Sequence, residues 1–494
     1  MIRQVTNLLI VEAERYPDGA LVDLYVRDGI IANVGRGLSR ARGDRVLQAR
    51  GGALLPGLHD HHLHLLALAA ARTSVQCGPP QVTRADDLAR ALRIPDGRGW
   101  LRGVGYHEVV AGELDRWKLD ALVPDRPVRI QHASGKAWFV NSAAAELLAL
   151  DRQTTLEGVE RDDQGRATGR LFRLDRWLRE RLAATDPPAL ARTSRALAAH
   201  GVTGVTDTSP DNDPATATLL LGAQAEGALL QRVRLMGGEG LSGLRDSNRL
   251  EVGELKILLD EDRLPDLDGL VARVQAAHGA GRGVAFHCVS RVELVYALHA
   301  LVAARAGRNR GDAESGSLPS DRIEHASVTP PELFPILRDL GVTVVTQPGF
   351  IAERGDRYLV EAESDERPHL YRLRSFIDAG VGLGLSSVAP YGAFDPWAAM
   401  RAARDRLTQG GQVIGAGEAL SPEAALGGFL SRADAPGGAP REVIAGQPAD
   451  LCLLDRPWRA AREALSASTV RLTIADGRPV PGPAASGTDL AWGV

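Results

Sequence analysis

The densest group of chemically active side chains lies near the N-terminal end of the chain. Four of the twelve histidines fall within six positions of the segment LLPGLHDHHLHLL, namely His59, His61, His62 and His64. His62 and His64 are two residues apart, and residues i and i+2 of a β-strand face the same side. Two imidazoles side by side at a strand end can bind one divalent cation. Asp60 shares their parity and could support them, whereas His59 and His61 have the opposite parity and are expected to be structural.

Two further histidines close short apolar segments that have the composition of buried strands. His287 lies near the end of GVAFHC, and His325 ends DRIEH. In a parallel βα barrel the active site lies at the carboxyl ends of the strands. Each of these histidines alone is better explained as a packed or surface side chain. Together with His62 and His64, their order along the chain predicts a metal site.

Lys256 is a fifth candidate, within the apolar segment ELKILLD. A buried ammonium group is costly unless it is used or neutralised. Lys256 therefore either serves the metal site or lies at an exposed strand edge. Zinc is the first expectation for a histidine-rich site with one or two ions, and iron, manganese or nickel would also fit.

The elements that must position these side chains follow from alternating sequence patterns. The helical segments 266–281 and 330–341 each end at a glycine, and each is followed by a short apolar strand, at 283–288 and 342–348. A helix, a glycine and a short buried strand form the repeat of a parallel sheet with crossover helices. Because the repeat persists along the middle of the chain, we predict an α/β fold with a (β/α)8 TIM-type barrel over residues 56–439.

Both ends of the chain differ from this middle region. Residues 1–55 contain β-rich runs separated by turn residues, and residues 440–494 repeat that pattern in PADLCLLDRP and STVRLTIADG. We therefore predict a small composite β-sandwich domain from both termini. Two unrelated β appendages would produce the same pattern.

The overall composition narrows the class of protein. The 494 residues are 44% hydrophobic and 24% charged, with a formal net charge of -4, which does not favour a nucleic-acid or membrane-surface partner. Three scattered cysteines indicate neither a disulfide framework nor a structural zinc site. Without a signal-peptide pattern or an apolar run near the ~18 residues of a membrane span, we expect a cytoplasmic protein acting on a small molecule, with a homodimer as one option.

Taken in order, these motifs resemble the amidohydrolase superfamily, and within it amidohydrolase family 3, the branch with N-substituted formamide deformylase-like and other exoenzyme-type amidohydrolases. GGALLPGLHDHHLHL is similar to the family's metal-binding signature, and FHCVSR and RIEHASV are similar to the segments with its two single histidines. ELKILLD falls where the family has a carboxylated lysine. The resemblance implies metal ligands at His62, His64, Lys256, His287 and His325, and usually zinc-assisted hydrolysis of an amide or related C–N bond.

The resemblance also implies a substrate-domain insertion at about 75–190, between the first two barrel strands. The segment PDRPVRIQHASGKAWFVNSAAAELL looks like that insertion, and it implies substrate contacts from His132, Lys136, Trp138 and Asn141. The family commonly has a histidine at the position of Lys136. Aromatic residues cluster in the insertion, where they either line a pocket over the metal or form the insertion's own core.

One position departs from the family in a way that bears on the chemistry. The family ends its eighth barrel strand with Gly-Ser-Asp-Ala-Pro, and this aspartate contacts a metal and takes the proton from the attacking water. The matching residues here are Ser386, Ser387, Val388, Ala389 and Pro390. Valine has no lone pair and no titrating group. General acid and base catalysis, typically worth about 10²–10⁴-fold, must therefore come from elsewhere or be lost.

We therefore predict a hydrolase of non-peptide C–N bonds with altered machinery, in which Lys256, His287 and His325 are catalytic. Three alternatives remain open for the missing aspartate. Another group can replace it as a donor or relay, or the reaction can need no strong acid, as in a lyase or isomerase step, or hydrolysis can have been lost in favour of ligand binding. The candidate replacement groups are Ser386, Ser387, Asp395 and Lys136.

Arg322 and Glu324 lie on the strand that reaches His325, on the opposite face if the period of two holds. We expect these two side chains to pack against helices or to form salt bridges. Cys288 follows His287 and should point away from the site, so a nucleophilic role is not expected.

Overall fold

The computed structural model describes residues 7–93, 99–182, 189–306 and 319–485. The chain divides into two compact units, the first made of Met1–His64 with Leu190–Val494 and the second of Leu65–Ala189. Within the described ranges, no helix has both the length and the apolar character needed to cross a membrane.

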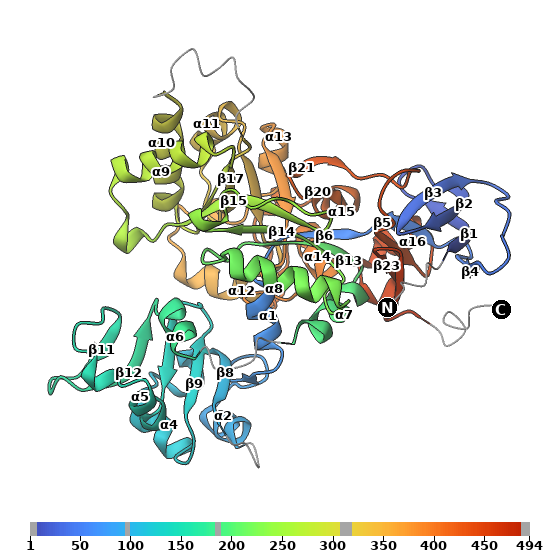
Figure 1. Cartoon of the computed structure of the whole chain (residues 1–494). Coiled ribbons are helices and arrows are strands. Elements are labelled where there is room, and N and C mark those ends of the chain that lie inside the picture. The colour runs from blue at the N-terminus through green and yellow to red at the C-terminus, as the bar shows by residue number, and fades with distance from the viewer. Residues whose placement is uncertain (1–6, 94–98, 183–188, 307–318, 486–494) are drawn as a thin grey trace. The chain divides into compact units, whose positions relative to one another are not determined.

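The first unit contains an eight-stranded sheet in which all neighbouring strands are parallel (Figure 1). The expected (β/α)8 barrel is confirmed. In sheet order its strands are β6 (Leu58–Leu63), β13 (Val202–Asp207), β14 (Arg232–Gly237), β15 (Leu250–Leu258), β16 (Val284–Cys288), β17 (Arg322–His325), β18 (Thr343–Thr346) and β19 (Gly382–Leu385).

Backbone hydrogen bonds just beyond the first and last strands bring the two edges of this sheet together. The Val388 N–H donates to the His62 carbonyl oxygen over 2.8 Å, and the His64 N–H donates to the Ala389 carbonyl oxygen over 2.8 Å. The sheet therefore closes at the carboxyl ends of β6 and β19, which is where two of the candidate histidines lie.

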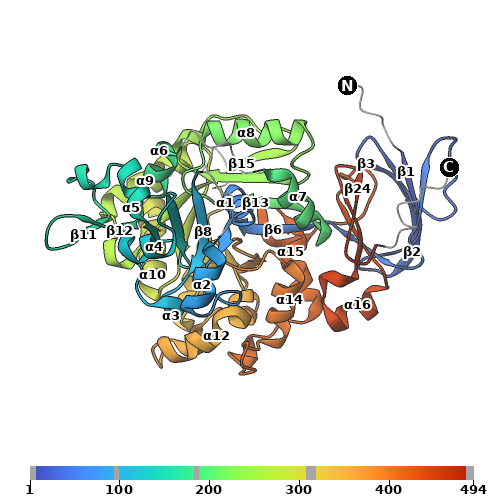
Figure 2. The same cartoon turned by 90° about the horizontal axis from the view of Figure 1, so that it is seen from below.

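Crossover helices cover the outside of the barrel (Figure 2). Aspartate or serine caps start several of them: Asp213, Asp266, Asp395 and Ser421 each accept a hydrogen bond from a first-turn N–H. These helices are α7 (Leu190–Ala199), α8 (Pro214–Ala225), α9 (Leu267–Gly279), α10 (Arg291–Ala306), α11 (Phe334–Asp339), α12 (Gly349–Glu361), α13 (Arg374–Asp378), α14 (Pro396–Asp405) and α15 (Pro422–Leu430).

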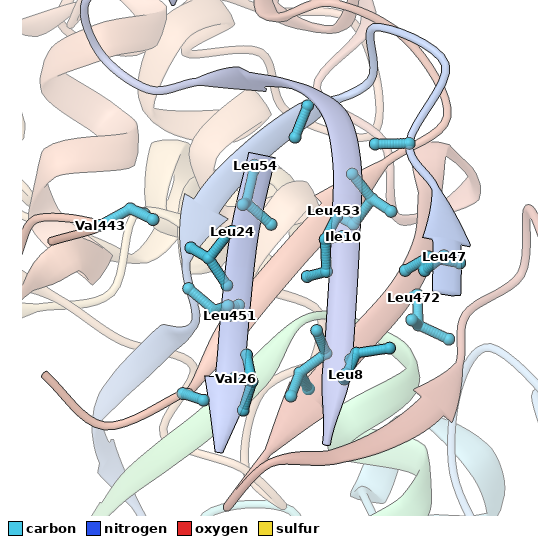
Figure 3. Close-up of a cluster of buried hydrophobic side chains, with 14 of the residues drawn as sticks. Leu8, Ile10, Leu24, Val26, Leu47, Leu54, Val443, Leu451, Leu453 and Leu472 are labelled. Atoms are coloured by element: carbon cyan, nitrogen blue, oxygen red, sulfur yellow. The ribbon is translucent and has the colours of Figure 1, made fainter. Parts of the chain in front are cut away.

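Strands from both ends of the chain share a second sheet, so the ends do not form two separate appendages. Alternate side chains such as Leu8, Ile10, Leu451 and Leu453 point into one apolar core (Figure 3). The strands are β1 (Leu8–Arg15), β2 (Ala20–Arg27), β3 (Ile30–Gly35), β4 (Arg45–Gln48), β5 (Ala53–Pro56), β22 (Leu451–Leu454), β23 (Val470–Ala475) and β24 (Arg478–Pro481). The hairpin β20 (Ser431–Arg432) and β21 (Ala435–Pro440) precedes β22, and α16 (Trp458–Ala464) follows it.

The second unit begins at Leu65, directly after the histidine pair, rather than at about residue 75. It holds a six-stranded sheet of β7 (Val75–Gln76), β8 (Leu101–Tyr106), β9 (Val128–His132), β10 (Ala137–Val140), β11 (Val159–Arg161) and β12 (Ala167–Phe172). Its helices are α1 (Leu65–Ala71), α2 (Ala85–Leu92), α3 (Glu108–Ala111), α4 (Arg116–Leu122), α5 (Ser142–Leu147) and α6 (Asp175–Arg181).

Candidate metal centre

The four candidate histidines come from three barrel strands and lie next to one another. His62 is on β6 with His64 one residue beyond it, His287 is on β16, and His325 is the last residue of β17. The ring centroids are 5.5 Å apart for His62 and His64, 4.8 Å for His62 and His325, and 4.5 Å for His287 and His325. These three contacts link all four rings into one cluster.

The spacing of the rings fits a shared cation. With a zinc–nitrogen bond of about 2.0–2.1 Å, two imidazoles on one tetrahedral ion have centroids about 5 Å apart. Among the residues that the structure describes, however, no three His, Cys, Asp or Glu side chains are already arranged as a metal-holding group. Binding of a metal would thus require some of these side chains to move.

Three of the histidines have one ring nitrogen occupied by a protein partner. The Nδ1–H of His62 donates to Glu324 Oε2, and that of His325 donates to Gln347 Oε1 over 2.7 Å. His64 Nδ1 lies 3.1 Å from the Ser209 hydroxyl. The Nε2 atom is the remaining ring nitrogen in each case. Partners of this kind fix the ring orientation and, for a carboxylate or amide oxygen, the tautomer of a metal-binding histidine.

Burial keeps these imidazoles in the neutral form that can bind a metal. It lowers the pKa of His64 and the pKa of His325 to about 4, and the charge of Lys256 acts in the same direction on both. Burial likewise lowers the pKa of His62 well below its ordinary value. A neutral imidazole carries the lone pair that coordination requires.

Lys256 is buried on β15 rather than exposed at a strand edge. Its Nζ atom has no hydrogen-bond partner among the described atoms. Burial lowers the pKa of this amine to about 8, although the nearby Glu324 carboxylate opposes the shift. The charge of this buried amine lowers the pKa of His62, His64 and His325. A buried amine without a hydrogen-bond partner beside such a cluster fits a role in the same site.

Val388 lies just beyond β19, with its backbone held by His62 and its side chain in an apolar cluster. The side chain is 3% exposed and packs in a group that includes Phe350, Leu370 and Tyr371. Its φ is 53°, in the left-handed region. The valine side chain itself has neither the lone pair nor the titrating group that an aspartate would carry.

The candidate replacement groups in the first unit have structural partners of their own. The Ser386 hydroxyl accepts a hydrogen bond from Gln347 Nε2 over 2.9 Å, and the Ser387 hydroxyl accepts one from the Ala389 N–H. Asp395 caps α14 through the Trp397 N–H. Among the described contacts, Ser386 is linked to His325 through the amide of Gln347.

Arg322 and Glu324 form a salt bridge, as one of the two expectations had it, but they do not lie on the face opposite His325. Both are fully buried, Arg322 pairs with Glu324 over 2.9 Å, and Glu324 reaches His62. The sheet does not pair β6 with β17, so this contact crosses the barrel interior. The strand alternation fails because His325 has a φ of 71°, which turns its side chain out of the regular period.

Glu324, Gln347 and Ser209 are contacts to the histidines that the sequence patterns missed. Glu324 immediately precedes His325, and Gln347 follows β18 at its carboxyl end, where a polar residue in a βα barrel is a signal of function. Asp60, which was expected to support the pair, accepts hydrogen bonds from the backbone N–H groups of His62 and Ser387.

Two of the expected substrate contacts serve the interior of the second unit. The amide of Asn141 bonds to the backbone at Val128, Ala144, Val123 and Arg126. Trp138 is buried in an apolar cluster, and its indole N–H donates to Asp175 over 2.8 Å. Tyr106 and Trp100 also pack in this unit, so most of its aromatic residues form its own core.

The other two expected contacts are more accessible. Lys136 is exposed. His132 is half-buried at the end of β9, with its ring nitrogens bonded to Ser134 and Glu108.

Comparison with known proteins agrees with this architecture. A curated N-substituted formamide deformylase from Arthrobacter pascens is 28% identical over 493 residues, which cover 87% of this chain and 89% of that protein. The crystal structure of an uncharacterized metal-dependent hydrolase from Pyrococcus horikoshii OT3 superposes with a TM-score of 0.72 at 21% identity, covering 91% of this chain and 98% of the other.

A third similar structure is atrazine chlorohydrolase TrzN from Arthrobacter aurescens TC1, complexed with zinc. It superposes with a TM-score of 0.52 at 15% identity and covers 97% of this chain and 96% of the other, which shows a shared fold. The sequence profile of the amidohydrolase family matches residues 45–481. With the barrel and its histidine cluster, this match shows that the chain belongs to the amidohydrolase family of hydrolases.

Proposed function

We propose that this chain is a metal-dependent hydrolase that cleaves a non-peptide, amide-like C–N bond of a small molecule. The observation that carries the proposal is the cluster of four imidazoles whose neighbouring ring centroids lie 4.5–5.5 Å apart at the carboxyl ends of barrel strands. The proposed ligands of one or two divalent ions, zinc first, are His62, His64, His287 and His325, with Lys256 beside them. When bound, such an ion activates water and polarises the substrate carbonyl.

The chain's own residues orient the imidazoles, supply a buried amine and limit proton transfer. Glu324, Gln347 and Ser209 hold three imidazoles so that Nε2 is the free ring nitrogen. Lys256 supplies a buried amine whose charge lowers the pKa of His62, His64 and His325. Because residue 388 is a valine, its side chain cannot transfer a proton to the leaving amine, and this step is expected to be slow for poor leaving groups.

Apolar side chains beside the histidines support a substrate with an apolar substituent. The Tyr391 ring lies edge-on to His64 with centroids 5.4 Å apart, and Val388 joins the neighbouring apolar cluster. N-formyl and N-acyl derivatives of apolar amines are therefore the first substrates to test.

The test is turnover of a panel of N-formyl and N-acyl amines by purified protein loaded with zinc. We expect hydrolysis that stops on removal of the metal by a chelator and returns when zinc is restored. The panel should pair each alkyl amide with an activated anilide of the same acyl group, because a good leaving group needs less protonation. Metal-loaded protein that hydrolyses neither class would contradict the proposal.

A second candidate function is favoured by one observation. The position of the missing aspartate is filled by a valine that is buried in an apolar cluster with Phe350 and Tyr371. Such an environment suits a family member that retains the metal and binds a ligand without hydrolysing it. Ligand-induced thermal stabilisation by unhydrolysed amides would identify this function.

A further inference from the structure

A line of paired charges runs through the barrel interior to the histidine cluster. Arg234 pairs with Glu254 over 3.1 Å, and Glu254 lies 4.0 Å from Arg322. Arg322 in turn pairs with Glu324 over 2.9 Å, and the other oxygen of Glu324 accepts the Nδ1–H of His62. The last three of these charged residues are at most 2% exposed, so solvent screens their interactions little.

The partners of the histidine Nδ1 atoms differ in charge. Gln347 offers a neutral amide oxygen to His325, and Ser209 offers a neutral hydroxyl to His64. Glu324 offers a carboxylate to His62. Hydrogen bonds with an ionised partner are roughly twice as strong as neutral ones. Among these three described contacts, His62 is thus the imidazole whose Nδ1 partner is a carboxylate.

Arg322 is placed to hold that carboxylate still. Besides its ion pair with Glu324, its Nη2 atom donates to the His61 carbonyl oxygen over 2.9 Å. The guanidinium therefore joins β17 to β6 at the residue that precedes His62. An unbalanced buried carboxylate would be strongly unfavourable, and the guanidinium offsets that cost.

We propose that Glu324 is a positioning residue for His62 and that Arg322 orients Glu324 and balances its charge. A carboxylate on Nδ1 fixes the tautomer and makes Nε2 a stronger donor toward a metal. The inference rests on the proposed metal site and adds a residue outside the ligand set. One Glu324 oxygen accepts the hydrogen bond of His62, and the other lies 2.9 Å from Arg322 Nε in an ion pair that lacks hydrogen-bond geometry.

The test compares two isosteric variants of the full chain, Glu324→Gln and Glu254→Gln. Each removes one buried carboxylate from the same line of charges, but Glu254 contacts no histidine in the described structure. Zinc affinity is measured by competition with a chromophoric chelator. We expect Glu324→Gln to weaken zinc binding by about 10–100-fold, and Glu254→Gln to change it much less.

A second readout separates positioning from general stability. The visible spectrum of cobalt-substituted protein reports the ligand field, and we expect it to change in Glu324→Gln but not in Glu254→Gln. Glu324→Asp keeps the charge with a shorter reach, and it should show an intermediate affinity; it also replaces Glu324→Gln in the comparison if the latter does not fold.

Equal losses of affinity in the Glu324→Gln and Glu254→Gln variants would overturn the inference, because both would then act only through the summed charge of the interior. Unchanged affinity and spectrum in Glu324→Gln would overturn it as well, while leaving the metal site intact. Failure of the wild-type protein to bind zinc is a different result, because it removes the proposed function and with it the inference.

Discussion

Val388 adopts a backbone conformation that suits other side chains better than its own. Its φ of 53° is uncommon for any residue with a β-carbon and is a marked outlier for a β-branched one. Aspartate and asparagine enter the left-handed region more readily. The backbone here is held by the hydrogen bond from the Val388 N–H to the His62 carbonyl oxygen. The position thus has a backbone conformation that suits aspartate, but it carries an apolar side chain.

Replacing Val388 with aspartate should therefore increase amide hydrolysis. Val388→Asp returns a proton acceptor to the end of β19, where general acid and base catalysis contributes about 10²–10⁴-fold. We expect at least a tenfold rise in kcat/KM for an alkyl amide and a smaller rise for an activated anilide. Steady-state kinetics of zinc-loaded protein measure both.

The matched control for this variant is Val388→Asn. Asparagine has nearly the same shape as aspartate and the same tolerance of a left-handed φ, but it does not titrate. It should give little or no gain. An equal gain in both variants would show that relief of the backbone, and not proton transfer, had been limiting, and would contradict the prediction.

The residues of the site were predictable to different degrees. The histidine pair was identifiable because two imidazoles at i and i+2 share one face of a strand, and His287 and His325 because they end apolar strands. Glu324 was assigned to the wrong face because the period of two ends at His325, where φ is 71°. Asn141 lies in a motif that suggests substrate binding, yet its amide bonds to the backbone of its own unit. Sequence spacing contains neither fact.

At the scale of elements, Asp60 links the first barrel strand to the end of the last. Its Oδ1 atom accepts the N–H of His62 over 3.2 Å and the N–H of Ser387 over 3.1 Å. β6 carries one half of the histidine cluster, and the segment after β19 carries Val388. The geometry of the site therefore depends on a carboxylate that does not contact the ligand nitrogens.

Asp60→Ala should weaken the junction between β6 and the segment after β19, where Asp60 bonds to His62 and Ser387. It leaves two buried N–H donors without their acceptor, and each such loss costs about 1–3 kcal/mol. Burial raises the pKa of Asp60 to about 6, so removal of the carboxylate also relieves a desolvation cost. We expect a net loss of about 2 kcal/mol in the free energy of unfolding, measured by urea denaturation of the metal-free protein.

Asp60→Asn keeps an acceptor at the Oδ1 position and should lose less than half as much stability. If the alanine and asparagine variants unfold at the same urea concentration, the hydrogen bonds to His62 and Ser387 do not support the junction.

The strands themselves were predictable, because each apolar run follows a helix and a glycine. The bonds that close the barrel were not, since they join residues more than 300 positions apart.

At the scale of the whole molecule, several buried imidazoles make stability depend on pH. Burial lowers the pKa of each of these rings below its ordinary value, to about 4 for two of them. In the unfolded chain the same imidazoles titrate near 6.5. The rings are His59, His61, His62, His64 and His325.

The metal-free protein should consequently lose stability as the pH falls below about 6.5. The unfolded state then binds protons that the folded state does not, so the free energy of unfolding decreases on acidification. Each fully buried ring contributes about 1 kcal/mol between pH 7 and pH 5.5. The raised pKa of Asp60 acts in the opposite direction and offsets part of the effect.

Urea denaturation at pH 7 and pH 5.5 measures the change, and a loss of at least about 2 kcal/mol is expected. In the zinc-loaded protein, the free energy of unfolding should begin to fall at a lower pH, because the metal competes with protons for the same nitrogens. A free energy of unfolding that is the same at both pH values would mean that the rings are not buried in the neutral form.

The broad architecture was also readable from the sequence, because strand-rich ends and an alternating middle are patterns of local composition. The start of the second unit at Leu65 was not, since α1 follows the histidine pair without a turn signal such as glycine or proline. Long-range pairing of the two termini was an inference from similar composition, and the shared sheet of β5 and β22 supplies its physical basis.

The most direct measurement is the amount of zinc retained by purified protein after loading and desalting, determined by elemental analysis. The wild-type chain is expected to retain at least about one equivalent, and His62→Ala and His325→Ala to retain almost none. His369→Ala, at a histidine that bonds to Arg372 away from the cluster, should retain zinc like the wild type. A folded wild-type protein that retains no zinc, or retention that is equal in all four proteins, would contradict the proposed metal centre.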